Sequence, residues 1–247
     1  MIIGQGITIG GGINVFDTPT EVSYVQSGLR LFFDPNNTSS YSGSGTNIND
    51  LSGNSLNGTM SNVTYNSPYF VFNGTSSTIS VSDNALLEPG TGDWSCEMWI
   101  YHSVITGSSR VLMGKTDNGG LAANWSYGLR TNTAGATYME VGNGTTSVTT
   151  PSYTLSTGQW YQIVGVWTNV ALNSIEFYVN GSSRGSNSHS FASIKNSIRS
   201  LYLGSYNGGE YSQWFNGRMG ITRIYNKALS SAEVLQNWNA NKSIYGL

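Results

Sequence analysis

The sequence predicts an all-β protein: a two-sheet antiparallel jelly-roll sandwich with one short C-terminal helix and an extended N-terminal arm. Three observations predict it. Short stretches rich in β-branched and aromatic residues recur along the chain, pairs such as Asn-Gly and Gly-Gly separate them, and one segment near the end has a helical pattern. Charged residues make up 10% of the chain, against about 25% in typical soluble domains.

Residues 1–22 differ from the rest of the chain and are predicted to form an anchoring arm. Isoleucines here are interspersed with Gly and Thr, largely at a period of two, which is typical of extended chain. A strand with no core of its own is stabilised by pairing with another chain or sheet. A disordered tail is the alternative interpretation. The residues expected to dock are Ile2, Ile3, Ile7, Ile9 and Ile13.

Residues 23–247 are predicted to form one β-domain. So many short strands in some 200 residues are typical of a sandwich or a barrel. The predicted strands are 28–33, 69–74, 77–82, 94–103, 110–115, 126–131, 137–143, 159–169, 174–183, 200–209 and 217–226.

One segment, residues 230–243, is predicted to be helical. Ser230 and Glu233 have the spacing of a capping box, and Val234, Leu235 and Trp238 form an apolar stripe. We expect this helix to pack at the edge of the sandwich.

Alternate residues of the strong strands fall into two sets. The apolar set, predicted to lie between the sheets, is Trp94, Cys96, Met98, Ile100, Ile175, Phe177, Val179, Leu201 and Leu203. The opposite set mixes aromatic with polar residues and includes Glu97, Trp99, Tyr101, Tyr178, Tyr202 and Arg223. Such a mixture suits a concave face on which sugar rings stack. Alternatively, loops or the terminal helix cover this face.

The segment "DLSGNSLNGTM", residues 50–60, is the candidate metal site. Asp50, Asn54 and Asn57 could supply oxygen atoms to a structural calcium ion. The same residues also form turns without a metal, and this is the favoured interpretation. A phosphate site is excluded because no basic residue lies between Arg30 and Arg110. No cofactor is expected to be required.

Motifs of enzymes are weak or absent in the sequence. The segment "GSSRG", residues 181–185, has the G-x-S-x-G spacing but not the strand-to-helix context of a nucleophile elbow. There is no Walker motif or G-x-G-x-x-G helix start, so no catalytic residue is assigned. Glu97 and Glu176 are central in strong strands, and a glycoside hydrolase using this pair is a remote alternative. The single Cys96 excludes an internal disulfide.

Charge and hydropathy limit the partners. The net charge is -2 and the 11 basic residues form no cluster, so a nucleic-acid partner is not expected. No apolar run is long enough to span a membrane, and no membrane partner is expected. The first residues lack the basic and apolar regions of a signal peptide, so we expect synthesis in a host cytoplasm.

Several segments together resemble a known superfamily across residues 28–247. They are 28–60, 73–82, "WSCEMWI", "GQWYQIVGVW", "IEFYVNG" and 217–238, and they resemble laminin-G-like, concanavalin A-like jelly-roll domains. With the Ile/Gly arm in front, the chain is similar to domains carried by structural proteins of tailed phages. The resemblance implies two packed antiparallel sheets and frequent carbohydrate binding. The fold hosts lectins, hydrolases and assembly proteins alike.

From this resemblance and the arm, we expect a non-enzymatic bacteriophage virion structural protein on the particle surface, as a capsid decoration, neck or tail fibre component. The arm would bind other virion proteins and copies of the same chain. The alternative is an adhesin that binds host-surface glycans with the aromatic face.

Overall fold

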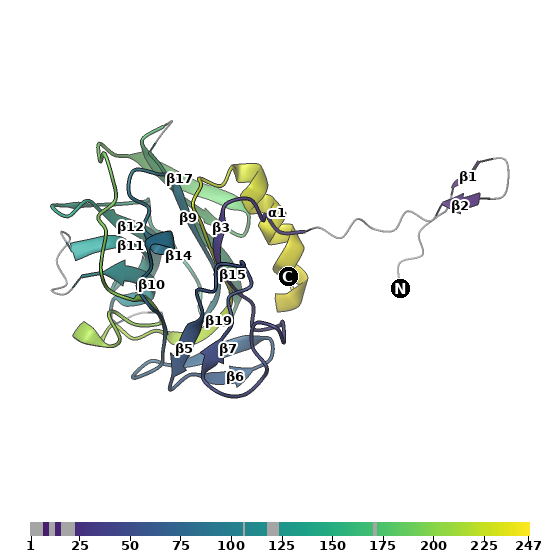
Figure 1. Ribbon diagram of the computed structural model, residues 1–247, viewed down its shortest axis with the longest axis horizontal. Helices are drawn as coiled ribbons and strands as arrows, with labels where there is room; N and C mark the ends of the chain where they lie inside the picture. The colour runs from purple at the N-terminus through teal and green to yellow at the C-terminus, as the bar shows by residue number, and fades with distance from the viewer. Residues whose placement is uncertain (1–6, 10–12, 16–22, 106, 118–123, 170–171) are drawn as a thin grey trace.

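The computed structural model describes residues 7–9, 13–15, 23–105, 107–117, 124–169 and 172–247 (Figure 1). Two antiparallel sheets pack face to face, which confirms the predicted jelly-roll sandwich. One sheet carries the C-terminal helix on its outer side and is called the helix-side sheet. The other is called the far sheet.

The helix-side sheet has eight strands. Their order is β17 (Ser182–Ser188), β16 (Ser174–Val179), β15 (Trp160–Thr168), β9 (Trp94–His102), β19 (Asn216–Tyr225), β7 (Tyr69–Asn73) and β6 (Thr64–Asn66), with β3 (Leu29–Phe33) also paired to β19.

The far sheet has nine strands. Their order is β13 (Ser147–Thr149), β12 (Ala136–Gly142), β11 (Trp125–Thr131), β10 (Arg110–Thr116), β18 (Leu201–Leu203), β8 (Thr78–Val81), β5 (Gly58–Ser61) and β4 (Asn47–Ile48), with β14 (Tyr153–Thr154) also paired to β12. Two 3-10 turns, η1 (Ala85–Leu87) and η3 (Glu210–Ser212), lie in its connections.

Every strand predicted in the β-domain is present, and six further strands among the described residues were missed: β4, β5, β6, β13, β14 and β17. The longest of these, β17, consists of Ser, Arg, Gly and Asn, and six of its seven residues are exposed. It forms an edge of the sheet and pairs with β16 alone. An edge strand held by backbone hydrogen bonds has no apolar alternation by which a sequence could predict it.

The predicted core residues all lie between the two sheets. The nine apolar residues named above belong to one buried cluster, joined by Tyr127, Leu129, Met139 and Val141 from the far sheet. Period-two alternation therefore identified the buried face correctly, because successive strand residues point to opposite sides.

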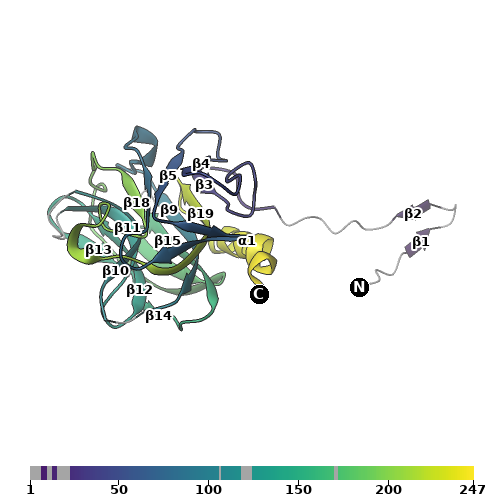
Figure 2. The same cartoon turned by 90° about the horizontal axis from the view of Figure 1, so that it is seen from below.

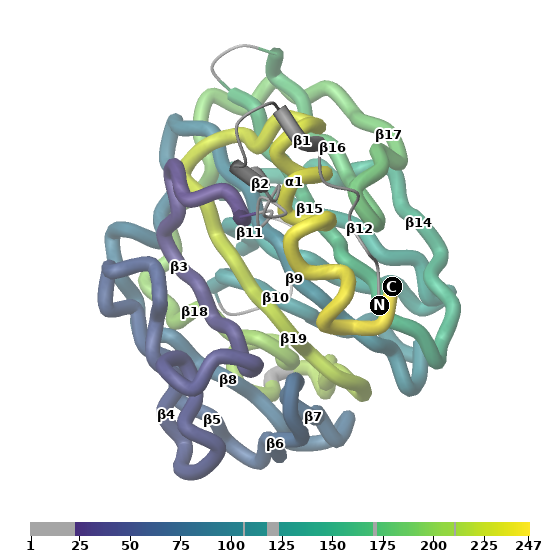
Figure 3. The backbone as a smooth tube through the Cα atoms, turned by 90° about the vertical axis from the view of Figure 1, so that its right-hand side faces the viewer, coloured from purple at the N-terminus to yellow at the C-terminus, as the bar shows by residue number. Residues whose placement is uncertain are grey.

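The predicted helix is present as α1 (Ser231–Asn241), and η4 (Lys242–Tyr245) follows it. The Ser230–Glu233 capping box is formed. Figure 3 shows α1 lying across β9, β15 and β19. The indole of Trp238 stacks on Trp99 with ring centroids 5.2 Å apart, and the ring of Tyr245 stacks on Trp99 at 4.6 Å.

A buried polar network holds α1 against the sheet. Glu97 accepts hydrogen bonds from Gln162 (2.9 Å) on β15, Arg223 (3.3 Å) on β19 and Asn237 (2.6 Å) on α1. Arg223 also donates to Asn241 (2.9 Å). Glu97 and Arg223 are fully buried. Such a pair is tolerated when further hydrogen bonds offset the cost of removing both charges from water.

The start of the domain is tied to the same network. The amide nitrogen of Val25 donates to Asn237 (2.8 Å), and the Val25 carbonyl accepts from the hydroxyl of Tyr225 (3.1 Å). The carbonyl of Ser23 accepts from Gln236 (2.7 Å). The β-domain therefore begins beside α1.

The described part of the arm forms a small sheet of its own. Strands β1 (Ile7–Ile9) and β2 (Ile13–Val15) pair antiparallel, with Ile7 opposite Val15 and Ile9 opposite Ile13. Ile2 and Ile3 lie outside the described residues. Docking of the arm on another chain stays a prediction. Among the described residues, no helix combines the length and the apolar character needed to cross a membrane.

A buried histidine makes the stability of the fold sensitive to acid. His102 is fully buried, and neither of its ring nitrogens has a hydrogen-bond partner. Burial, with a smaller contribution from Arg110, lowers the pKa of His102 from 6.5 to about 4. Between these two pH values the imidazole of His102 is mainly protonated in the unfolded chain and mainly neutral in the folded chain. The free energy of unfolding therefore falls as the pH drops from 6.5 towards 4.

We therefore expect His102→Phe to reduce the loss of unfolding free energy between pH 7 and pH 4.5 by about 2 kcal/mol. Urea unfolding at the two pH values measures this. His189→Phe is the comparison and should reduce the loss less, because His189 is only partly buried and its ring lies within hydrogen-bonding distance of the Thr168 carbonyl. An unchanged acid sensitivity in His102→Phe would contradict the assignment.

The buried network predicts a second effect on stability. Glu97→Ala leaves the buried Arg223 without its counter-charge and should cost about 3 to 5 kcal/mol in unfolding free energy. Glu176→Ala is the matched control, since Glu176 on β16 is partly exposed and accepts from the hydroxyls of Ser183 and Tyr178 but from no buried cation. Similar small losses in both variants, measured by urea unfolding, would refute the role given to Glu97.

Candidate functional site

The face predicted to bind sugars is covered by the C-terminal helix. Glu97, Trp99 and Arg223 are 0% exposed, and Tyr178 is 4% exposed. The prediction of an open aromatic face is therefore wrong at these four residues, and the alternative, that the terminal helix covers it, is correct. The physical reason is that α1 and η4 must bury Trp238 and Tyr245, and the flat aromatic surface of the sheet receives them.

The other two predicted residues lie elsewhere. Tyr101 is partly buried near the end of β9, and the guanidinium of Arg218 lies over its ring at 4.4 Å. Tyr202 lies on β18 of the far sheet, so it belongs to the opposite side of the sandwich. The six residues therefore do not form one open surface.

The possible catalytic pair does not meet. Glu97 on β9 and Glu176 on β16 are separated by β15, two strand spacings or about 10 Å. Glu97 is also engaged by Arg223. Two other carboxylates, of Asp83 and Glu88, do approach each other, but they share the buried ammonium of Lys115 at 2.6 and 2.7 Å.

The loop at Asp50 is built from turns. One carboxylate oxygen of Asp50 accepts from the amide nitrogens of Phe32 and Ser52 (both 2.9 Å). The other accepts from the Ser52 hydroxyl (2.7 Å) and the Leu56 amide nitrogen (3.0 Å).

The remaining candidate ligands in this loop are also engaged. Asn57 accepts from the Asp50 amide nitrogen (2.9 Å), and Asn54 donates to the Arg30 carbonyl (3.0 Å). The carboxylate oxygens of Asp50 and the amide oxygen of Asn57 thus accept hydrogen bonds from the chain itself, so turns account for their positions. A structural calcium ion stays a prediction. In the described part of the chain, no group of three or more His, Cys, Asp or Glu could hold a metal.

An open hollow lies on the outer side of the far sheet. Its volume is about 270 Å³, and it is lined by Asn132, Tyr138, Thr149, Thr150 and Ser152. We call it the Tyr138 hollow. Tyr138 is on β12 opposite Arg130 of β11, and Thr149 is on β13 opposite Glu140 of β12. Figure 2 shows β10, β11 and β12 on the side of the sandwich away from α1.

Polar groups in the Tyr138 hollow are available to a ligand. Within the part of the chain that the structure describes, the phenol of Tyr138 and the hydroxyls of Thr149 and Ser152 have no hydrogen-bond partner. The amide oxygen of Asn132 accepts from the amide nitrogens of Ala134 and Ala136 (both 3.0 Å), which holds the side chain in place. Its amide nitrogen is left as a donor.

Charges beside the hollow are already paired. Arg130 forms an ion pair with Glu140, and Glu140 accepts from the hydroxyl of Ser147 (2.7 Å). The Arg130 guanidinium also lies over the ring of Trp125 at 4.4 Å. Burial raises the pKa of Tyr138, so its phenol remains a neutral donor at physiological pH.

The sequence alone did not identify the Tyr138 hollow. Its polar residues lie in or next to loops, where Asn, Thr and Ser are ordinary turn formers. The one available signal was Tyr138, which alternates with the buried Thr137 and Met139 in a predicted strand.

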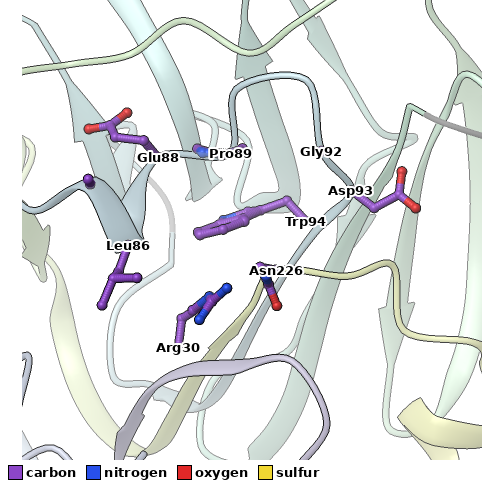
Figure 4. Close-up of a pocket in the computed structure, with 9 residues that line it drawn as sticks. Arg30, Leu86, Glu88, Pro89, Gly92, Asp93, Trp94 and Asn226 are labelled. Atoms are coloured by element: carbon purple, nitrogen blue, oxygen red, sulfur yellow. The ribbon is translucent and has the colours of Figure 1, made fainter. Parts of the chain in front are cut away.

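A second recess, which we call the end cavity, opens at the end of the sandwich (Figure 4). Its volume is about 160 Å³. Arg30 of β3, Trp94 of β9, Leu86 of η1, Pro89 and Asn226 line it, with Glu88 and Asp93 at the rim.

Comparison with solved structures finds the same fold in several binding domains and enzymes. The binding domain of Paraclostridial Mosquitocidal Protein 1 superposes with a TM-score of 0.68 and 17% identity, over 90% of this chain and 55% of that chain. Trypanosoma rangeli sialidase in complex with sialic acid gives 0.66 and 13%, over 89% and 34%. Domain 4 of AbnA, an extracellular arabinanase from Geobacillus stearothermophilus, in complex with arabinotriose, gives 0.63 and 19%, over 85% and 97%.

These identities establish the fold alone. The chain spans about half of the mosquitocidal binding domain and a third of the sialidase. No curated protein sequence matches it. Enzymes and non-enzymes share this lectin-like fold.

A family model matches residues 73–235, from the end of β7 into α1. The match covers most strands of both sheets and agrees with the sandwich described above. The chain therefore belongs to the concanavalin A-like lectin/glucanases superfamily.

Proposed function

We propose that this chain is a non-enzymatic carbohydrate-binding domain, and that it binds a glycan in the Tyr138 hollow. One observation carries the proposal. The ring of Tyr138, the oriented amide of Asn132 and unpaired hydroxyls line the same open recess. A sugar offers an apolar ring face for stacking and hydroxyls that both donate and accept, so these groups complement it.

The similar structures support this proposal. Domain 4 of the arabinanase matches this chain over almost its whole length, and that domain is in complex with arabinotriose. A sandwich of this size is therefore large enough to hold an oligosaccharide.

The chemistry of the Tyr138 hollow supports binding without hydrolysis. A glycosidase needs a pair of carboxylates on either side of the scissile bond. No carboxylate lines the hollow as the structure describes it, and the neighbouring Glu140 is neutralised by Arg130.

A second function, assembly through the N-terminal arm, is favoured by the pairing of the arm. Among the described strands, β1 and β2 pair only with each other. A two-stranded ribbon has an unpaired edge on each strand, which is a template for strand addition. Ser23 and Val25 join the arm to the domain beside α1, so attachment there leaves the hollow free. This arrangement suits a virion structural protein of a tailed phage that displays a sugar-binding domain outward.

The carbohydrate proposal predicts that Tyr138→Ala weakens glycan binding by about tenfold or more, since the stacking surface and the phenol are lost together. A glycan array identifies the ligand, and calorimetry on parent and variant measures its affinity. Tyr211→Ala is the matched control, because Tyr211 is 57% exposed on another loop. Equal affinity in Tyr138→Ala and in the parent would refute the assignment.

The assembly proposal predicts a change of oligomeric state. Light scattering after size exclusion should find a defined oligomer for the full chain and a monomer for a chain starting at Glu21. Removal of the ribbon eliminates the unpaired strand edges and leaves the domain intact. Two monomers would contradict self-assembly through the arm.

A further inference from the structure

The end cavity contains a cation without a counter-charge. Arg30 is partly buried, and within the described part of the chain no carboxylate forms an ion pair with it. In the orientation that satisfies both ends of its amide, Asn226 accepts from the guanidinium of Arg30 and donates to the carbonyl of Gly28 (3.0 Å). A guanidinium has five N–H donors, so most of those of Arg30 remain open to a ligand.

The two carboxylates at the rim of the end cavity are engaged elsewhere. Glu88 pairs with the ammonium of Lys115 (2.7 Å) and accepts from the amide nitrogen of Ser197 (3.3 Å). Asp93 accepts from the amide nitrogen of Asn169 (2.8 Å). Figure 4 shows both carboxylates turned away from Arg30. The charge directed into the cavity is therefore positive.

The rest of the wall is mainly apolar. Figure 4 shows the guanidinium of Arg30 facing the ring of Trp94, with Leu86 beside it, and Pro89 also lines the cavity. A cavity of about 160 Å³ suits a small molecule or one sugar unit.

We propose that the end cavity is a second binding site, and that its ligand is a small carboxylate anchored by Arg30. The planar fork of a guanidinium matches the two oxygens of a carboxylate, and a partly desolvated cation gains from an anionic partner. The carbon skeleton of the ligand packs on Leu86, Pro89 and Trp94. The carboxylate can come from an acidic sugar or from a simple organic acid, and the two sources are separated by experiment.

The test is a titration of the full ¹⁵N-labelled chain, followed by NMR in chloride buffer. The probes are sodium D-glucuronate, sodium acetate and D-glucose. We expect glucuronate to cause saturable shifts of the Arg30 and Trp94 resonances and glucose to cause none there. Shifts by acetate with equal affinity identify a site for the carboxylate alone, and shifts by glucuronate alone identify a site for an acidic sugar.

Variants assign the effect to Arg30. Arg30→Gln should weaken the binding of the active carboxylate by tenfold or more, and Arg30→Lys, which keeps the charge without the fork, should weaken it less. Arg199→Gln is the matched control, since Arg199 is exposed and its side chain does not line the cavity. If Arg30→Gln does not fold, the comparison of Arg30→Lys with the parent carries the test.

The proposal is overturned if neither carboxylate shifts the Trp94 resonances in a saturable way, if glucose shifts them equally, or if the folded Arg30 variants bind as tightly as the parent. This outcome is independent of the Tyr138 hollow. Tyr138→Ala should leave carboxylate binding unchanged, and Arg30→Gln should leave the binding of neutral glycans unchanged.

Discussion

The buried ion pair between Glu97 and Arg223 is the interaction on which the rest of the arrangement depends. It joins neighbouring strands β9 and β19, and Asn237 of α1 completes it from above. Removing two charges from water is costly, and here each partner has further hydrogen bonds that offset the cost. Two of those bonds come from Asn237 and Asn241 of the helix, and the amide nitrogen of Val25 in turn donates to Asn237. The buried charges therefore depend on the docked helix, which the start of the domain helps to hold.

Docking of the helix makes the two outer sides of the sandwich unequal. α1 and η4 cover the aromatic face of the helix-side sheet, and the start of the domain lies on the same side. The far sheet keeps the Tyr138 hollow open. The proposed attachment and the proposed binding site therefore lie on opposite sides, a division that a symmetric sandwich would not have.

The cations of Lys115 and Arg30, which lie near each other, differ in whether carboxylates of the chain neutralise them. The ammonium of Lys115 is fully buried and meets Asp83, Glu88 and the carbonyls of Ser197 and Arg199. These acceptors satisfy it completely, and it ties η1 and the loop before β18 to the far sheet. Because Lys115 holds Glu88, that carboxylate cannot neutralise Arg30. The satisfied cation thus leaves the neighbouring one free for a ligand.

The sequence by itself determined the strands with apolar alternation, the core face and the capped helix, because each depends on residues close together in the chain. It did not determine β17, whose polar and largely exposed residues show no apolar alternation. Only the tertiary structure decided that Trp99 is buried, because an aromatic surface suits a packed helix as well as a sugar. Likewise, Asp50 has the chemistry of a calcium ligand, but folding brings the amide nitrogens of Phe32 and Leu56 to its oxygens. The end cavity arises where Arg30, residues 85–94 and Asn226 meet, which no local pattern records. The Tyr138 hollow lies within residues 132–152, but its Asn, Thr and Ser residues look like ordinary turn formers in the sequence.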